Sequence, residues 1–204
     1  MRLVIIGIQG SGKGTQAKIL SKKFKIPHIS VWDLLRDVKG KDKKIIEKYM
    51  IKGKLSPVKI TIKLLKERLK KQDAKNGFIL DGFPRNKEQT EILQKITDID
   101  KVIEIYISDK ISIERLSSRL TCSKCGTLYN EITNPPKNQN LCDKCDSVLF
   151  KRKDDYPEAI KERIQIYKKE KKAILSKYKK ILISVDGEKS IEDVNKEIME
   201  KLRK

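Results

Sequence analysis

Near its N-terminus the chain reads Gly7-Ile8-Gln9-Gly10-Ser11-Gly12-Lys13-Gly14-Thr15. This stretch follows the apolar run 3–7, which predicts a buried strand, and it opens a helical pattern over 13–24. Glycines let such a loop curl so that successive N–H groups point at phosphate oxygens, and the helix N-terminus adds a partial positive charge. Strand, loop and helix together predict a phosphate-binding loop in an α/β protein.

Individual positions of the loop have distinct expected roles. Lys13 can reach the β- and γ-phosphates of a nucleotide, and the hydroxyl of Thr15 can bind phosphate or magnesium. Gly14 stands between them, so the loop departs from the plain pattern, in which the hydroxyl residue follows the lysine directly. The residues expected to bind the triphosphate are Gly10, Ser11, Gly12, Lys13, Gly14 and Thr15.

Short β-branched runs alternate with longer amphipathic ones, as is typical of a parallel sheet flanked by helices. The expected strands are 3–7, 27–30, 78–81, 102–107 and 181–185. The expected helices are 13–24, 57–71, 87–96, 110–120, 157–178 and 190–201. Segment 31–56 has helical character but no strand, and segment 121–150 is rich in turn formers, so both are predicted to be insertions into the α/β core.

Bulk properties narrow the class of protein further. A chain of 204 residues is long enough for one substantial core with small insertions. It contains no run of eighteen apolar residues, and its N-terminal apolar run is too short for a signal peptide, so a cytosolic protein without a membrane span is expected.

The net charge of +20 raises the question of nucleic-acid binding. Nearly all of the excess is lysine, spread through helical stretches such as 168–172 and 177–180, and this spread is typical of solvated helix faces. We therefore expect no nucleic-acid partner. The competing hypothesis is a different class of protein, a P-loop ATPase with a nucleic-acid-binding zinc ribbon. Its binding to DNA or RNA would depend steeply on salt concentration.

Three blocks of sequence in collinear order carry a family resemblance. They are Gly12-Lys13-Gly14-Thr15-Gln16-Ala17, Asp81-Gly82-Phe83-Pro84-Arg85, and Arg152-Lys153-Asp154-Asp155 followed by Arg163. Together they resemble the adenylate kinase family, over essentially the whole chain. The resemblance implies a P-loop NTPase fold with a core of 1–29, 57–118 and 153–204, a monophosphate-binding insertion over 30–56, and a zinc-bearing lid over 119–152.

The resemblance also implies an activity, the reversible transfer of a phosphoryl group from Mg·ATP to AMP, giving two ADP, by an enzyme that is monomeric. Such a transfer depends on positioning and charge neutralisation more than on covalent participation. The catalytic cations implied are Lys13, Arg85, Arg119, Arg152 and Arg163. Asp81, at the end of an expected strand, would hold Mg²⁺ through its water shell.

Two nucleotide sites follow from the same resemblance. ATP would contact Arg115 and Arg119 in addition to the loop. The residues implied for AMP are Val31, Arg36, Gly82, Arg85, Gln89, Arg152 and Arg163. Gln89 favours AMP, because the resemblance implies a glutamine at this position in adenylate kinases and an asparagine in the related UMP/CMP kinases. Its amide can both donate to and accept from the adenine edge.

Residues 30–36 depart from the family pattern. Val31 stands where the family presents a threonine hydroxyl to AMP, and Trp32, the only tryptophan, stands where glycine is usual. Losing one hydrogen bond costs about 0.5–1.5 kcal/mol, so a weaker affinity for AMP is expected. Trp32 is expected either to pack as core or to line the monophosphate pocket and change base selectivity, and UMP, CMP or GMP as the preferred acceptor is the alternative.

The four cysteines form two pairs, Cys122-x2-Cys125 and Cys142-x2-Cys145, separated by sixteen residues. This spacing is typical of a tetrahedral Zn²⁺ site, and a site closed by four cysteines is structural rather than catalytic. Disulfides are the competing interpretation, which a cytosolic chain disfavours, and a redox CxxC lacks its usual βαβ context. His28, the only histidine, is expected to be a structural residue at a strand end.

Overall fold

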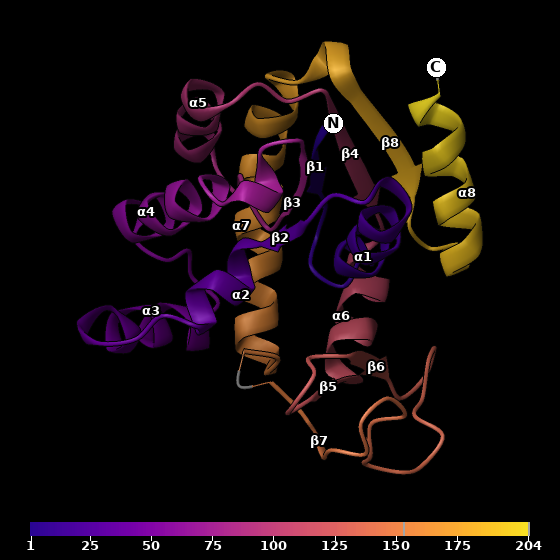
Figure 1. The fold of residues 1–204 in the computed structure, drawn as a ribbon. Coiled ribbons are helices and arrows are strands. Elements are labelled where there is room, and N and C mark those ends of the chain that lie inside the picture. The colour runs from indigo at the N-terminus through magenta and orange to yellow at the C-terminus, as the bar shows by residue number, and fades with distance from the viewer. Residues whose placement is uncertain (153, 204) are drawn as a thin grey trace.

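A computed structural model of the chain describes residues 1–152 and 154–203. Residues 153 and 204, the two ends of the last expected core segment, lie outside the described residues. Figure 1 shows a larger α/β unit with a small β-rich segment at one end. Among the described residues, no helix combines the length and the apolar character needed to cross a bilayer.

Five parallel strands form the central sheet, in the order β2-β3-β1-β4-β8. They are β1 (Arg2–Ile6), β2 (His28–Ser30), β3 (Phe78–Asp81), β4 (Lys101–Tyr106) and β8 (Leu182–Asp186). Asp81 is in register with Ile5 on one side and with Ser30 on the other. The carboxyl ends of β1, β2 and β3 therefore lie side by side, which is where open α/β sheets bind ligands.

Helices cover both faces of the sheet. They are α1 (Lys13–Phe24), α4 (Val58–Leu69), α5 (Lys87–Ile96), α6 (Asp109–Ser117), α7 (Pro157–Ser176) and α8 (Ile191–Leu202), with short 3₁₀ helices η1 (Gln72–Ala74) and η2 (Lys179–Ile181). Successive residues of β1 point to opposite faces: Val4 and Ile6 join a cluster with α4, α5 and α7, whereas Leu3 and Ile5 join one with α1 and α8. Figure 1 shows α4 and α5 on one side of the sheet and α8 on the other.

The segment between β2 and α4 is helical, as the sequence predicts. It contains α2 (Val31–Arg36) and α3 (Lys41–Ile51). The hydroxyl of Ser30 accepts a hydrogen bond from the backbone N–H of Asp33 at 3.2 Å and so caps α2. Because β2 ends at Ser30, α2 begins at the same sheet edge as the phosphate loop.

The cysteine-bearing segment forms a second sheet, which is antiparallel and ordered β6-β5-β7. Its strands are β5 (Arg119–Cys122), β6 (Leu128–Asn130) and β7 (Leu149–Phe150). The helix expected over 110–120 is wrong at its end, because α6 stops at Ser117 and Arg119 begins β5. Pairing of Arg119 with Asn130 and packing of Leu120 in the small apolar cluster of this sheet outweigh the local helical pattern.

Candidate active site

The loop between β1 and α1 has the backbone conformation that its glycines allow. Gly10 and Gly12 have φ of 81° and 89°, in the left-handed region that favours glycine. Gly12 is also the N-cap of α1, and as a glycine it has no side chain to accept from the first N–H groups of the helix. The first turn of α1 contains no acidic residue, so its N–H groups and positive end suit an anion.

Lys13 is half-buried at the start of α1. Its Nζ donates to the carbonyl oxygen of Ile8 at 2.7 Å and lies 3.5 Å from the hydroxyl oxygen of Ser11. Burial lowers the pKa of Lys13 to about 7; attraction by Asp81 opposes this shift, and repulsion by nearby arginines adds to it. A phosphate group beside this ammonium would favour its charged form.

Asp81 ends β3 and faces the loop. A Cβ added to Gly14 would lie 3.4 Å from Asp81 Oδ2, so the glycine that departs from the plain loop pattern keeps side-chain atoms away from this carboxylate. His28 Nε2 lies 3.3 Å from the same oxygen, so the residue expected to be only structural contacts the site. Burial opposes ionisation of Asp81, but the hydrogen bond with His28 and the charges of Lys13 and Arg85 hold its pKa below the ordinary value.

Arginines from β5 and α7 converge on two aspartates. Arg119 donates to both carboxylate oxygens of Asp155, from Nε at 2.8 Å and from Nη2 at 2.6 Å. Arg163 donates to Asp155 at 2.9 Å and to the Asp154 carboxylate at 3.2 Å. Burial opposes ionisation of Asp155, but the two arginines outweigh it and keep its pKa below the ordinary value. Paired carboxylates thus hold in place two cations expected at the transferring phosphoryl group.

Arg85, Arg152 and Arg36 complete the cationic group. Burial, with other charges contributing, lowers the pKa values of Arg85 and Arg152 to about 10, so both remain cations at neutral pH. Arg152 Nε donates to the hydroxyl of Thr121 at 2.9 Å. Arg36 pairs with exposed Asp33, and its buried Nη2 lies 3.7 Å from Asp154 Oδ1 without a hydrogen bond to any described residue.

Several of the residues expected to bind nucleotide line one cavity. Its lining includes Lys13, Gly82, Arg85 and Arg163. Arg115, expected beside the ATP base, lies against the phosphate loop instead of inside this cavity's lining, donating to the carbonyl oxygens of Gly187 at 2.9 Å and Gly10 at 3.4 Å. The sheet edge therefore carries a phosphate loop on one side and a cluster of cations on the other.

Gln89 is buried in the first turn of α5. Its Oε1 accepts a hydrogen bond from the backbone N–H of Arg85 at 2.8 Å, and its own backbone N–H donates to Asn86 Oδ1, the cap of the helix. An amide oxygen has two lone pairs, so this bond leaves Gln89 able to accept another. Gln89 thereby also fixes the backbone that carries Arg85.

Val31 and Trp32, the two residues that depart from the family pattern, lie in different surroundings. Val31 is 2% exposed and belongs to the apolar cluster that contains Val4 and Ile6. Trp32 is half-buried against the same cluster, and its ring lies near two expected AMP residues, 4.9 Å from the Arg85 guanidinium carbon and 5.6 Å from that of Arg36.

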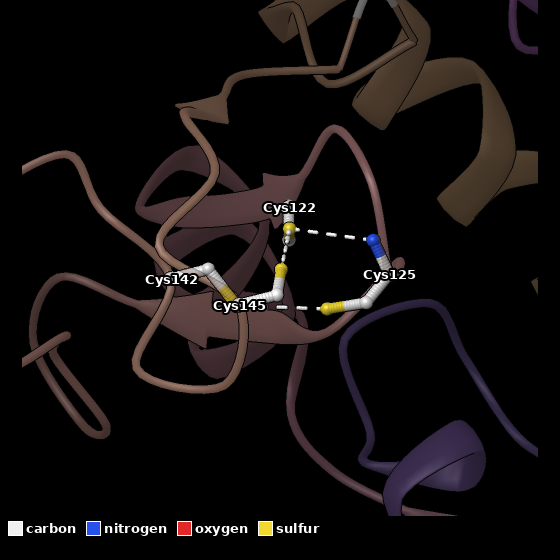
Figure 2. Close-up of side chains that lie close together, drawn as sticks. All are labelled: Cys122, Cys125, Cys142 and Cys145. Atoms are coloured by element: carbon white, nitrogen blue, oxygen red, sulfur yellow. Dashed lines mark hydrogen bonds between the residues drawn. The ribbon is translucent and has the colours of Figure 1, made fainter.

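The four cysteines come together at the small antiparallel sheet. Their sulfur atoms all lie within 4.8 Å of one another, and the Cys122–Cys145 and Cys125–Cys142 distances are both 3.5 Å (Figure 2). A tetrahedral zinc site with Zn–S bonds of about 2.3 Å has sulfur atoms about 3.8 Å apart, so the donor set fits Zn²⁺. All four residues are free cysteines, which is the state that metal binding needs.

Groups around the sulfurs support the same chemistry. Tyr129 OH lies 3.5 Å from Cys142 Sγ, and the backbone N–H of Cys125 donates to Cys122 Sγ. A hydrogen bond with the Thr127 hydroxyl lowers the pKa of Cys125 to about 6. Backbone N–H donors lower the pKa of Cys122, but burial and the neighbouring Cys125 and Cys145 outweigh them and raise it to about 11. Donors directed at the sulfurs orient them as ligands.

Sequence reasoning missed the roles of Asp154 and Asp155, and the contact of His28 with Asp81. Asp154 and Asp155 follow Arg152 and Lys153 in the sequence, and this run of opposite charges was the available signal. The pairing of Asp155 with Arg119 joins positions 36 residues apart, and that of His28 with Asp81 joins positions 53 apart. Neither pairing can be read from spacing along the chain.

Known proteins resemble this chain over its whole length. A family model described as adenylate kinase matches residues 5–183. The adenylate kinase of Caldicellulosiruptor bescii is 42% identical over 212 aligned positions, covering 99% of each chain. That of Methanocella arvoryzae is 42% identical, covering 100% of this chain and 99% of its own, and that of Staphylococcus aureus strain MW2 is 40% identical, covering 98% of each. With its phosphate loop and converging arginines, this chain belongs to the adenylate kinase family.

Proposed function

We propose that this enzyme transfers the γ-phosphoryl group of Mg·ATP to AMP, reversibly, and so forms two ADP. The observation that best supports this proposal is the cavity at the sheet edge, where Lys13, Arg85 and Arg163 converge beside the phosphate loop. A phosphoryl group in transfer bears charge on its equatorial oxygens, and positioned cations stabilise that charge. The relatives at 40–42% identity that carry the name adenylate kinase support the same reaction.

The phosphate loop would hold the donor. The N–H groups of residues 10–15 at the start of α1 would bind the β- and γ-phosphates, with the Lys13 ammonium beside them. Arg115 would lie against the adenine, and the Thr15 hydroxyl would bind phosphate or the metal. Asp81, with its lowered pKa, would hold Mg²⁺ through water, and the ion would neutralise phosphate charge.

The acceptor would lie across the cavity. Arg36 and Arg85 would bind the AMP phosphate, next to Gly82, and the Gln89 amide would read the adenine edge. Val31 would lie beside the nucleotide without a hydroxyl to offer. These groups orient the attacking phosphate oxygen toward the γ-phosphorus, so no separate general base is required.

Arg119, Arg152 and Arg163 would surround the transferring group. In the structure Arg119 and Arg163 share Asp155, and a phosphoryl group could take over donors that now serve carboxylates. Such an exchange of partners would couple substrate binding to closure of segments 30–56 and 119–152. Closure excludes water, which otherwise competes with AMP as acceptor.

The cysteine cluster would hold a structural Zn²⁺ in segment 119–152. The segment's own apolar cluster is small, with Tyr129 and Leu149 beside the cysteines, so a metal cross-link supplies stability that packing does not. We further propose a monomer acting in the cytosol without nucleic acid. One chain carries every cation assigned above, and the free cysteines suit a reducing compartment.

Another acceptor, UMP, CMP or GMP, is not favoured, since the relatives are named adenylate kinases and Gln89 suits adenine. The direct test is ADP formation from Mg·ATP and AMP, followed by ATP and AMP formation from ADP alone. The proposal predicts both directions with the same enzyme preparation. Failure to form ADP from Mg·ATP and AMP would refute it.

A further inference from the structure

The single tryptophan contacts two cations that belong to different parts of the chain. Trp32 and Arg36 are four residues apart on α2, so the helix places them on one face. Arg85 comes from the segment after β3, and its guanidinium carbon lies over the same indole at 4.9 Å, against 5.6 Å for Arg36. Both distances are within the range of about 6 Å at which a cation is attracted to an aromatic face.

The backbone around Gly82 makes this contact possible. Arg85 Nε donates to the Gly82 carbonyl oxygen at 2.8 Å, which folds the side chain back along its own segment. A Cβ built on Gly82 would lie 3.3 Å from Arg85 Nη2 and 3.9 Å from the backbone nitrogen of Trp32. With φ at 80°, Gly82 both adopts a turn that favours glycine and lets α2 approach the Arg85 side chain.

The charges around Arg85 include one carboxylate that also lies near Arg36. Arg36 and Arg163 repel Arg85, while Asp81 and Asp154 attract it, and burial is the largest cause of its lowered pKa. Asp154 Oδ1 lies 3.7 Å from Arg36 Nη2, an ion pair that is too long for a hydrogen bond. A carboxylate hydrogen-bonded to both arginines would occupy the N–H donors that a phosphate needs. An indole face attracts the plane of a guanidinium and leaves its in-plane N–H groups free. The buried Arg36 Nη2 is such a donor, because it makes no hydrogen bond to a described residue and its ion pair with Asp154 is 3.7 Å long.

We propose that Trp32 is a positioning residue for the phosphate of the acceptor nucleotide. Its indole holds the guanidinium groups of Arg36 and Arg85 together against their mutual repulsion, with their N–H donors directed to one phosphate. The inference rests on the proposed roles of these two arginines in binding AMP. It also gives a reason for tryptophan next to Val31, since better-ordered cations offset a missing hydroxyl.

The test replaces the ring by an apolar side chain without a π face. Trp32→Leu should raise the KM for AMP by about 5- to 30-fold and leave the KM for ATP within twofold. Trp32→Phe, which keeps a weaker π face, should give an intermediate KM. Trp32→Met should raise the KM for AMP by the same factor as Trp32→Leu, and it replaces the leucine variant if that variant does not fold. Tyr49→Leu, an exposed aromatic on α3, is the matched control and should change neither KM.

Kinetics with a second acceptor nucleotide distinguish positioning of the phosphate from recognition of the base. The KM for CMP should rise in Trp32→Leu by the same factor as that for AMP, because both carry the same phosphate. A rise for AMP alone would overturn the proposal in favour of base selectivity, and an unchanged KM for AMP would overturn it outright. Wild-type activity is measured first. If the wild type forms no ADP from Mg·ATP and AMP, the proposed function is refuted. If the wild type is active and Trp32→Leu has the same KM for AMP, this inference alone is refuted.

Discussion

Asp155 accepts two hydrogen bonds from the guanidinium of Arg119, at 2.8 Å and 2.6 Å, and its side chain is fully buried. Arg163 donates to the same carboxylate at 2.9 Å. One acidic group thus links β5 of the small sheet to α7 of the larger unit. Because both arginines are proposed to bind the transferring phosphoryl group, this carboxylate connects stability of the fold with the chemistry.

Asp155→Asn should destabilise the enzyme by about 3 kcal/mol, since removing one partner of a buried ion pair leaves charge uncompensated. Urea unfolding measures it, with Glu47→Gln, at an exposed pair with Lys43, as a control expected to change stability by less than about 0.5 kcal/mol. The pKa of Asp155 is lowered in the folded state, so its contribution is present above the unfolded pKa and is lost as the pH falls through the folded pKa. Equal stability of Asp155→Asn and wild type at pH 7 would contradict this role.

Binding of Mg·ATP should take up a proton at pH 8. Before nucleotide binds, the pKa of Lys13 is about 7, so the amine is largely neutral at pH 8. The phosphates favour the ammonium and raise the pKa, so the group gains a proton from the buffer on binding. Calorimetry in two buffers of different ionisation enthalpy detects this uptake. The uptake should shrink at pH 6, where Lys13 is already charged, and identical heats in both buffers at pH 8 would exclude it.

Removal of zinc should lower the melting temperature and loosen segment 119–152. The four sulfurs lie within 4.8 Å of one another, whereas the phosphate loop is built on β1 and α1 of the larger unit. The affinity for Mg·ATP should therefore change little. Metal analysis before and after chelation, thermal unfolding and nucleotide titration check these points together. An unchanged melting temperature after verified metal loss would show that the cluster has no structural role.

Val31→Thr should lower the KM for AMP by about 2- to 10-fold, because one hydrogen bond contributes about 0.5–1.5 kcal/mol. The same change should reduce thermal stability slightly, since Val31 is 2% exposed among apolar side chains and a buried hydroxyl needs a partner. Steady-state kinetics and thermal unfolding on the same preparation separate the two effects. A KM for AMP that stays the same or rises would contradict the expectation of weakened binding at this position.

Local patterns were sufficient for much of the fold. The start and end of α1 were predicted to the residue, the start because a glycine loop precedes it and the end from its amphipathic pattern; in the structure Lys25 ends the helix in a left-handed conformation. The strands of the larger sheet were each predicted within one or two residues. The apolar runs of β1, β3 and β4 are buried on both faces, and β8 alternates buried with half-buried residues, so each leaves a pattern in the sequence. The four-cysteine cluster was predicted from spacing alone.

Relationships between distant residues could not be predicted in this way. The end of α6 at Ser117 depends on pairing of Arg119 with Asn130. The contact of Trp32 with Arg85 depends on how closely α2 approaches Gly82, which no periodicity encodes. In each case tertiary structure decides between states that the local sequence leaves open.

The most direct test of the central claim is the rate of nucleoside diphosphate formation from Mg·ATP with AMP, UMP, CMP and GMP, measured in parallel under one set of conditions. The account predicts that kcat/KM for AMP exceeds that for each other acceptor by at least about tenfold, which corresponds to about 1.4 kcal/mol of discrimination by Gln89 and its surroundings. A kcat/KM for UMP, CMP or GMP equal to or greater than that for AMP would contradict it.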